Sequence, residues 1–312
     1  MFALRGIAVS LTFFVLFYCF LSALVSVSWR GLRWWLKATE QSLADLLFLL
    51  RVLPLFAAIL VTLTFVVPSF QLLEPRLTGE GVGTMPIALG MTALFFIAWG
   101  CHRVVSAQTR TSRIVARWVA GCQPLDKNAQ TFAFRSRRHA PPLTLVGMRK
   151  PRVLVSDSAV ELLSADELEV ALRHELAHIR SYDNLKKLVF RFCPFPGMAP
   201  LEAAWSQAAE LAADDAAILN MNDAINLAAA LVKLSRLVPV AAPPACTVGF
   251  VTGSLHERVN RLLAWDEARK PRRRPIPRWA ALPPLLLAVF CAFVNYGPLL
   301  SMTHEATEWL VR

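Results

Sequence analysis

Cysteine pairs are missing from this sequence. Six cysteines are scattered through its 312 residues with no Cys-x-x-Cys motif and no paired spacing. This pattern excludes a disulfide framework, because such frameworks need sets of cysteines at regular, pairable spacings. Free thiols are the expected state.

Charged residues are also scarce. Asp, Glu, Lys and Arg make up 18% of the chain, hydrophobic residues make up 55%, and the mean hydropathy is +0.46. These values are too apolar for a soluble enzyme and indicate a membrane protein. The net charge of +11 comes with no recognition-helix pattern and no aromatic–basic pattern, so we expect no direct nucleic-acid binding. Most of the basic excess flanks apolar runs, where it faces the headgroups of the lipid bilayer.

Four apolar runs approach the ~20 residues that a membrane-spanning helix needs. They are Ile7–Trp29, Val52–Phe70, Met85–Cys101 and Trp279–Leu300. We therefore predict a membrane domain over residues 1–101 with three transmembrane helices, at about 7–29, 52–70 and 85–101. A fourth transmembrane helix is predicted over 279–300, followed by a short tail over 301–312. Residues 102–278 contain no such run and are long enough to form one soluble domain with its own core.

Lysine and arginine beside the runs predict the orientation, because positively charged loops stay in the cytoplasm. Three basic residues follow the first run within residues 30–37, whereas the loop 71–84 has only Arg76. The central segment carries four arginines between residues 103 and 117 and ends with the run RKPRRRP at 269–275. We predict that the central domain lies in the cytoplasm and that both termini lie outside.

Two charged residues, Asp45 and Arg51, lie beside the second apolar run. If the hydrocarbon core begins near Val52, Arg51 extends to the cytoplasmic surface and residues 41–51 form an interfacial helix. The alternative is a buried charged pair that gates the helix bundle.

The central segment predicts a small α+β domain. Gln123–Pro142 is polar, basic and interrupted by prolines, which is typical of a linker or exposed loop. Leu143–Val146 and Arg152–Val155 indicate a β-hairpin. Helices are predicted after it over Ser164–Leu188, Pro200–Asn220, Asp223–Leu237 and Leu255–Trp265. The fold class is therefore a mainly α membrane protein with four transmembrane helices and an α+β domain inserted between the third and the fourth.

The motif HELAH at residues 174–178 lies inside a predicted helix. The sequence SADE at 164–167 fits a capping box that starts this helix, so the motif does not cross its end. Residues four apart stack on one helix face, which lets His174 and His178 offer two imidazoles to one ion. Glu175 is displaced by about 100° and can reach a water on the ion without ligating it.

A catalytic zinc ion needs a third protein ligand and one open position. The stretch EAAWSQAAELAADDAAI at 202–218 offers Glu210, with Asp214 one turn later on the same face. We predict that Glu210 is the third metal ligand and that Asp214 holds the free ring nitrogen of one histidine. Glu202 and Asp215 are weaker alternatives for the third ligand. Without a metal, these carboxylates would be only a solvated acidic stripe.

These motifs together resemble a known family. The sequences HELAHIRSYDNL (174–185) and ELAADDAAI (210–218), separated by a proline-containing connector, are similar to the BlaR/MecR-type membrane metallopeptidases. Residues 146–178 resemble the family's strand, connector and helix, and LHERVNRLLAW (255–265) resembles its later helix. Those enzymes are gluzincins, related in their active-site plan to the CAAX-prenyl and heat-shock membrane proteases. The resemblance covers most of the chain.

The resemblance implies a gluzincin-like zinc metallopeptidase domain in the cytoplasm, on a multi-pass protein of the bacterial inner membrane. It implies one Zn²⁺ held by His174, His178 and Glu210, with Glu175 as the catalytic base and Asp214 as the carboxylate behind a ligand. The implied substrate is a cytoplasmic protein, a BlaI-like transcriptional repressor that is cut in regulatory proteolysis. The alternatives are a quality-control protease of the heat-shock or CAAX type and a non-catalytic signal transducer with a structural zinc. The sequence does not determine the oligomeric state, and a homo-oligomer is compatible with it.

One departure from the family concerns its sensor. Members that sense β-lactams carry a penicillin-binding domain after the fourth span, whereas only residues 301–312 follow it here, and the sequence has no Ser-x-x-Lys motif. We expect a stand-alone form that does not receive β-lactams by that route.

The implied reaction is metal-assisted peptide hydrolysis with Glu175 as the proton carrier. The strand Arg152–Val155 could hold an extended substrate by edge pairing, or it could be an ordinary core strand. No residue is assigned as the oxyanion donor: His256 is expected at the surface, and the related proteases place their donor at a position that corresponds to Thr252.

Overall fold

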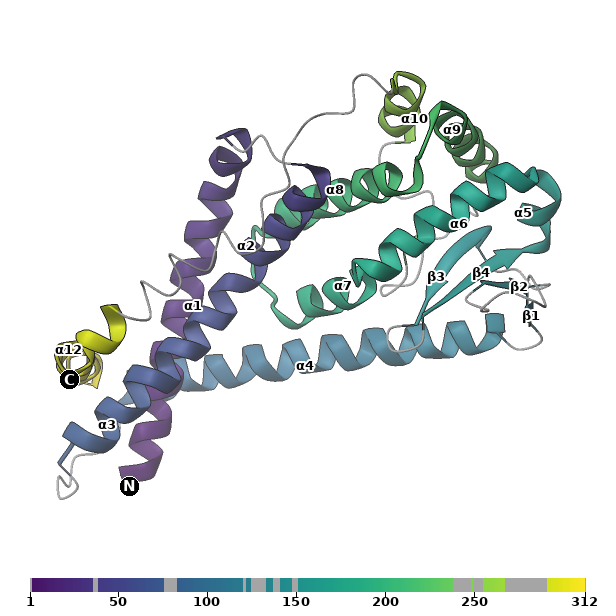
Figure 1. Cartoon of the computed structure of the whole chain (residues 1–312). Coiled ribbons are helices and arrows are strands. Elements are labelled where there is room, and N and C mark those ends of the chain that lie inside the picture. The colour runs from purple at the N-terminus through teal and green to yellow at the C-terminus, as the bar shows by residue number, and fades with distance from the viewer. Residues whose placement is uncertain are drawn as a thin grey trace.

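The structure is a computed structural model that describes residues 2–35, 39–75, 83–119, 122–124, 133–136, 141–147, 151–237, 248–249, 255–266 and 291–311. Three long apolar helices form its N-terminal part (Figure 1). They are α1 (Phe2–Trp35), a continuous helix over Glu40–Leu73, and α4 (Thr84–Val119). The second of these consists of α2 (Glu40–Val61), a π-helical turn η1 (Thr62–Val66) and α3 (Val67–Leu73).

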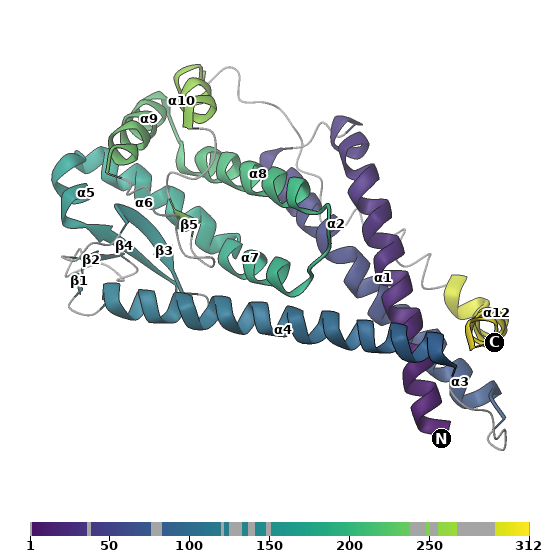
Figure 2. The ribbon, with the colours of Figure 1, turned by 180° about the vertical axis from the view of Figure 1, so that it is seen from behind.

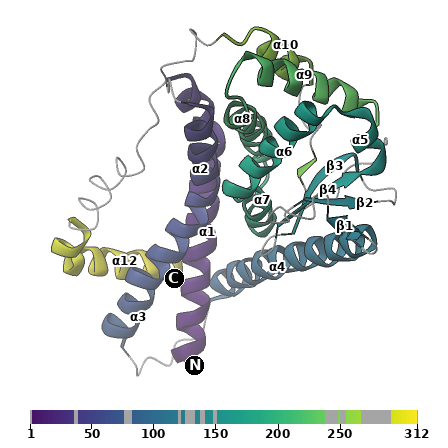
Figure 3. The same cartoon turned by 45° about the vertical axis from the view of Figure 1, so that its right-hand side comes forward.

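All three helices are long and apolar enough to cross a membrane, so the described residues contain three candidate spans in the regions where three were predicted, and they indicate a multi-pass membrane protein. Most of the predicted fourth span, residues 279–290, lies outside the described residues. Its described part is helical over 291–294 and continues at Tyr296 into α12 (Tyr296–Val311). In Figure 3, α12 lies beside α3, at the end of the helix bundle remote from α10.

Helix α4 extends far beyond the predicted span and runs along the soluble domain as a long arm (Figures 1 and 2). It passes through the predicted boundary at residues 101 and 102 without a break. The arm packs against α7 (Asp183–Phe192). Gly100 allows this close approach, because a side chain there would collide with the backbone carbonyl oxygen of Phe192.

The soluble domain contains a small sheet. The predicted hairpin is confirmed as β3 (Leu143–Val146) and β4 (Arg152–Ser156), which pair antiparallel with Leu143 opposite Val155. The sheet order is β1-β2-β4-β3-β5, with β2 (Ala133–Ser136) parallel to β4. The outer strands β1 (Gln123–Pro124) and β5 (Val248–Gly249) are two residues long each.

One prediction about this sheet is wrong, and one of two open alternatives is excluded. The stretch Gln123–Pro142 is not only a linker, because it contributes β1 and β2. The pattern concealed β2, because its residues are mostly half-buried and show no alternation of apolar and polar side chains. Strand β4 also cannot hold a substrate by edge pairing, because β2 and β3 occupy both of its sides.

The four helices predicted in the domain are observed, one of them with a break, together with one short helix that was not predicted. The capping box of Ser164 and Glu167 starts α6 (Ala165–Arg180), as predicted. The helix predicted to continue to Leu188 ends instead at Arg180, because Tyr182 adopts a left-handed conformation (φ 55°) that turns the chain into α7. The remaining helices are α5 (Asp157–Leu162), α8 (Ala199–Ala217), α9 (Met221–Ser235) and α10 (Leu255–Leu263).

Two cores hold the chain together. One lies inside the soluble domain, where side chains of β3, β4, α6, α9 and α10 pack. The other joins membrane helices to the soluble domain: Val25 and Trp29 of α1 and Leu47 of α2 pack with Phe190 of α7 and Trp205 of α8. The soluble domain is therefore packed directly onto the cytoplasmic ends predicted for the first two spans.

Arg51 belongs to this shared core and does not extend to a surface, so the expected arrangement is wrong. It is 2% exposed, donates to Glu202 of α8 at 2.9 Å and to the carbonyl oxygen of Cys193, and lies over the Phe190 ring. The alternative pair with Asp45 is also absent, because Asp45 bonds Lys186 of α7. Asp45 and Arg51 are thus both paired with the soluble domain, because helix α8 packs against α2 where water was expected.

Candidate metal centre

Two helices bring three metal-binding side chains together. His174 and His178 lie one turn apart on α6, and Glu210 lies on α8. The Nε2 atoms of the two histidines are 3.1 Å apart. Glu210 Oε2 lies 3.6 Å from His174 Nε2, and Glu210 Oε1 lies 3.8 Å from His178 Nε2. All three residues are buried, with at most 2% of their surface exposed.

These separations fit one tetrahedral ion. Donor atoms that each lie about 2.1 Å from a zinc ion are about 3.4 Å apart at tetrahedral angles. The observed separations of 3.1 to 3.8 Å bracket this value. Two imidazoles and a glutamate are also a common donor set of catalytic zinc. The three residues can therefore hold zinc, and no further described residue joins the group as a fourth ligand.

Carboxylates orient both imidazole rings from behind. Asp214 Oδ1 lies 3.0 Å from His174 Nδ1, and Asp183 Oδ2 lies 2.6 Å from His178 Nδ1. A carboxylate at Nδ1 keeps the proton on that nitrogen and leaves Nε2 free for the metal. Sequence reasoning missed Asp183. The available signal was an acidic residue directly after the Ser-Tyr turn that follows HELAH, where α7 begins.

A buried arginine closes the cluster, and sequence reasoning missed it as well. Arg258 of α10 is 3% exposed; it donates through Nη1 to Glu210 at 3.0 Å and through Nε and Nη2 to Asp214 at 2.8 and 2.6 Å. The available signal was its position four residues before the buried Leu262, on the apolar face of the helix. Arg258 neutralises charge that two buried carboxylates would otherwise carry alone.

Mutual pairing controls the protonation of the cluster. Burial alone would lower the pKa of His174, but the carboxylates of Asp214 and Glu210 raise it to about 9. Burial alone would raise the pKa of Glu210, yet the nearby histidines and Arg258 lower it to about 2. The pKa of Asp214 is also far below its ordinary value, because Arg258 and His174 outweigh the effect of burial. Both carboxylates are therefore ionised at neutral pH.

Glu175 differs from the other carboxylates. It is fully buried, and burial raises its pKa above the ordinary value despite the attraction of both histidines. Neither of its carboxylate oxygens has a hydrogen-bond partner among the described residues. A buried carboxyl group without partners is costly in a structural role, so its position beside the histidines points to a chemical one.

The remaining candidates lie elsewhere. Glu202 bonds Arg51 at 2.9 Å, and Asp215 bonds Arg261 at 2.6 Å near the surface, so neither joins the histidines. His256 is exposed and contacts Asn260, which agrees with the surface position expected for it. Thr252 lies outside the described residues.

Comparison with known proteins gave one match. The model of the BlaR1 peptidase M56 family matches residues 87–262, which is more than half of the chain. The matched segment begins in α4 and ends in α10, so it includes every residue of the metal centre. No curated protein and no solved structure matches the chain significantly.

Replacing Arg258 tests the charge balance of the centre. Arg258→Met should weaken zinc binding about 10- to 100-fold. Without the arginine, Glu210 and Asp214 repel each other, which displaces both the proposed ligand Glu210 and the carboxylate that orients His174. It should also lower the thermal stability, since breaking a buried ion pair costs about 3–5 kcal/mol. Zinc content and melting temperature of the purified protein measure both effects.

The matched control is Arg261→Met on the same helix. Its partner Asp215 is 43% exposed at the side chain, so loss of this pair should cost less than about 1 kcal/mol and leave zinc bound. Equal zinc binding by the Arg258 and Arg261 variants would contradict the role given to Arg258.

Zinc affinity should rise with pH. In the metal-free protein His174, with its pKa raised to about 9, is protonated at pH 7, whereas a ligand must be neutral. The apparent affinity should therefore increase about tenfold per pH unit from pH 6 to 8 and level off above about 9. Competition titrations with a chelator across this range measure the slope. Asp214→Asn removes one of the two anions that raise the pKa of His174, so the plateau of zinc affinity should begin at lower pH in this variant. A wild-type affinity independent of pH would contradict the protonated state of His174.

Proposed function

The chain belongs to the BlaR1 peptidase M56 family, as its motifs predicted, and from this premise we propose that it is a zinc endopeptidase of the membrane that cuts a cytoplasmic protein. The observation that carries the proposal is the buried group of His174, His178 and Glu210, beside which Glu175 has no hydrogen-bond partner among the described residues. M56 proteins are metallopeptidases, so the choice of zinc and the choice of substrate are what the proposal adds.

The residues divide the reaction among them. His174, His178 and Glu210 would hold the ion, which when bound would polarise the scissile carbonyl and lower the pKa of a water molecule to about 7. Glu175 accepts the proton of the attacking water and passes it to the leaving amine nitrogen. Its raised pKa suits this role, because a carboxyl group with an ordinary pKa would be a weaker base at neutral pH. Asp183 and Asp214 hold the imidazole rings of His178 and His174 in the orientation that points Nε2 at the ion.

The number of ligands supports catalysis over a structural role. Structural zinc sites are closed by four protein ligands, whereas catalytic sites keep one position open. Within the described residues the group has three ligands, and the charged neighbours Asp183, Asp214 and Arg258 are engaged with the ligand side chains.

Burial implies that the substrate must gain access. The three ligands and Glu175 are at most 2% exposed, so a peptide reaches them only after neighbouring elements move. Among the described elements, helix α10 covers Glu210 and Asp214 through Arg258. Activity is thus proposed to require displacement of α10, which suits an enzyme that is switched on by a signal.

The proposed substrate is a BlaI-like repressor in the cytoplasm. The family membership supports the repressor as substrate, and the positive charge near the soluble domain supports its cytoplasmic location. The arm of α4 that lies along the domain carries Arg103, Arg110, Arg113 and Arg117, as expected on the cytoplasmic side of a bacterial membrane.

Replacing Glu175 separates catalysis from metal binding. Glu175→Gln should retain about one zinc ion and reduce proteolysis about 10²- to 10⁴-fold, because the proton carrier is lost while all ligands stay. Glu169→Gln, an exposed change on the same helix, is the matched control and should cleave at the wild-type rate. The assay follows a co-expressed candidate repressor and metal content by elemental analysis. Cleavage by Glu175→Gln at the wild-type rate would refute the proposed peptidase mechanism.

The orientation is tested with reporter fusions or cysteine accessibility. Residue 78 and the C-terminus should be accessible from outside, and residues 35 and 230 from the cytoplasm, because the basic flanks stay inside. An external residue 230 would remove the cytoplasmic substrate from the proposal.

A further inference from the structure

A second group of metal-binding side chains lies at the end of the helix bundle remote from α10 (Figure 3). It consists of Glu74, directly after α3, and of His304 and Glu308 on α12. One donor atom from each of these residues lies within 4.8 Å of the others. Glu74 belongs to the segment 71–84 and the other two to the tail 301–312, both of which the distribution of basic residues predicts to be outside.

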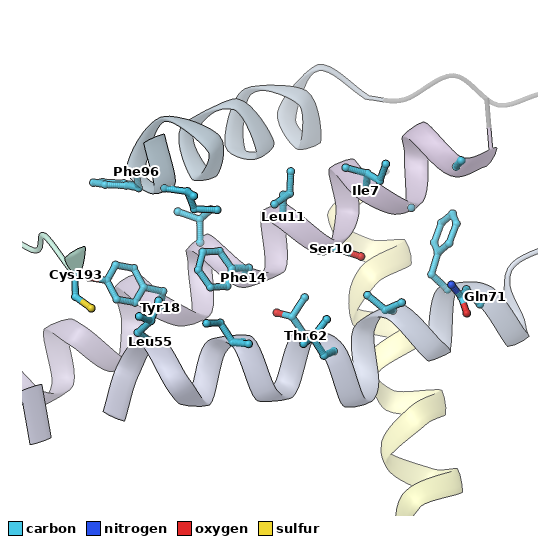
Figure 4. A pocket seen from close by; sticks show the side chains of 18 of the residues that line it. Ile7, Ser10, Leu11, Phe14, Tyr18, Leu55, Thr62, Gln71, Phe96 and Cys193 are labelled. Carbon is cyan, nitrogen blue, oxygen red and sulfur yellow. The ribbon is translucent and has the colours of Figure 1, made fainter. Parts of the chain in front are cut away.

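The group lies where the apolar part of the helix bundle ends. Figure 4 shows an apolar cavity between α1 and the Glu40–Leu73 helix, with Gln71 at one end. None of the described residues that line this cavity is charged. Glu74 follows Gln71 by three residues and is the position at which the helix stops. The charged donors are therefore placed beside the apolar region and not inside it, where their desolvation would be costly.

The separations resemble those of the metal centre. His304 Nε2 lies 3.5 Å from Glu308 Oε1, and His304 Nδ1 lies 3.9 Å from Glu74 Oε2. In the metal centre the distances from imidazole nitrogen to glutamate oxygen are 3.6 and 3.8 Å. His304 and Glu308 are also four residues apart on one helix, which is the spacing that lets two donors reach one ion.

Protein contacts alone do not satisfy the imidazole. His304 Nδ1 is buried and has no hydrogen-bond partner among the described residues, because 3.9 Å is too long for a hydrogen bond to Glu74. A buried polar atom without a partner costs free energy, and an ion held between the imidazole and the carboxylates offsets that cost. The side chain of Glu308 is 41% exposed, so an ion can enter from solvent without a movement of helices.

An arginine supports the buried carboxylate, as in the metal centre. Arg5 Nη1 lies 3.0 Å from Glu74 Oε1, while Oε2 of the same carboxylate faces His304. Arg258 Nη1 lies at the same distance from Glu210, the proposed ligand of the metal centre. Two carboxylates and one guanidinium leave this group with one net negative charge, so it attracts a cation while Arg5 fixes Glu74 in place.

We propose that Glu74, His304 and Glu308 form an external binding site for an exchangeable divalent transition-metal ion, for which Zn²⁺ is the probe. The imidazole favours Zn²⁺, Ni²⁺ and Cu²⁺ over Mg²⁺ and Ca²⁺, which prefer oxygen ligands. Water completes the coordination, so the ion is held more weakly than at the buried centre. It joins α12 to the end of α3. This site is independent of the proposed peptidase function.

The test is a zinc titration of the untagged full chain in nanodiscs, read by competition with a chelator. The wild type should bind two zinc ions, the external one at least about 10-fold more weakly because it is open to water. His304→Ala removes the nitrogen donor and should abolish the weaker class. The matched control His102→Ala removes an exposed histidine of α4 and should keep both classes. Retention of the tight zinc ion shows that each variant is folded.

A second variant leaves the buried side chains of the group intact. Glu308→Gln keeps the size of the side chain and removes its charge, so it should weaken the weaker class about 10-fold. Zn²⁺ at about ten times its Kd should also slow amide hydrogen exchange in α12 about 10-fold in the wild type, because a ligand of the folded form stabilises it by RT ln(1 + [L]/Kd). It should have no such effect in His304→Ala.

Three results would overturn the proposal. Binding of a single zinc ion by the wild type would show that these side chains hold no metal. A weaker class that survives unchanged in His304→Ala and in Glu308→Gln would place the second ion elsewhere. Displacement of the weaker zinc ion by an equal concentration of Ca²⁺ would show an acidic surface that attracts cations without using the imidazole. Loss of peptidase activity alone would bear on the metal centre and on none of these measurements.

Discussion

A charge buried away from water is tolerated only beside an opposite charge, and this constraint organises the soluble domain. His174, Glu210 and Asp214 lie on two helices, and none of them is more than 2% exposed. Arg258 must therefore come from a third helix, and Asp183 from a fourth, to complete the balance of charge. These five side chains have no water around them to stabilise their charges, so each depends on its protein neighbours. This dependence is what brings helices α6, α7, α8 and α10 together at the metal centre.

The same rule explains how the membrane helices are joined to the peptidase. Arg51 is buried in the second apolar helix, and its partner is Glu202 of α8, eight residues before Glu210 on the same helix. Around this pair, aromatic and aliphatic side chains of α1, α2, α7 and α8 form one continuous core, including Trp29 and Trp205. The spans are thus part of the packing that positions a metal ligand, and they are more than an anchor.

This arrangement gives the membrane a physical route to the metal centre. The segment between α7 and α8 is held at Pro194 by Tyr18 from α1 and at Cys193 by Arg51 from α2. At the opposite end of α8, Arg258 covers Glu210 and Asp214. Helix α8 therefore connects the core shared with the membrane helices to the buried metal centre.

The sequence by itself determined the features that depend on local spacing. Three spans follow from apolar length, the start of α6 from its capping box, and the pairing of His174 with His178 from the helical repeat. The ELAADD stretch also pointed to Glu210 and Asp214, because they too lie one turn apart. The family likeness rested on the same local motifs, and the family match agrees with it.

Only the tertiary structure decided which distant residues share a buried site. Arg258 lies 44 residues from Asp214 along the chain, and Arg51 lies 151 residues from Glu202, so no local pattern connects either pair. Strand β2 was concealed for the same reason, because its pairing with β4 and not its own composition makes it a strand. Spacing along a chain specifies which face of a helix a side chain occupies, but burial and charge balance depend on what packs against that face, and that is a property of the fold.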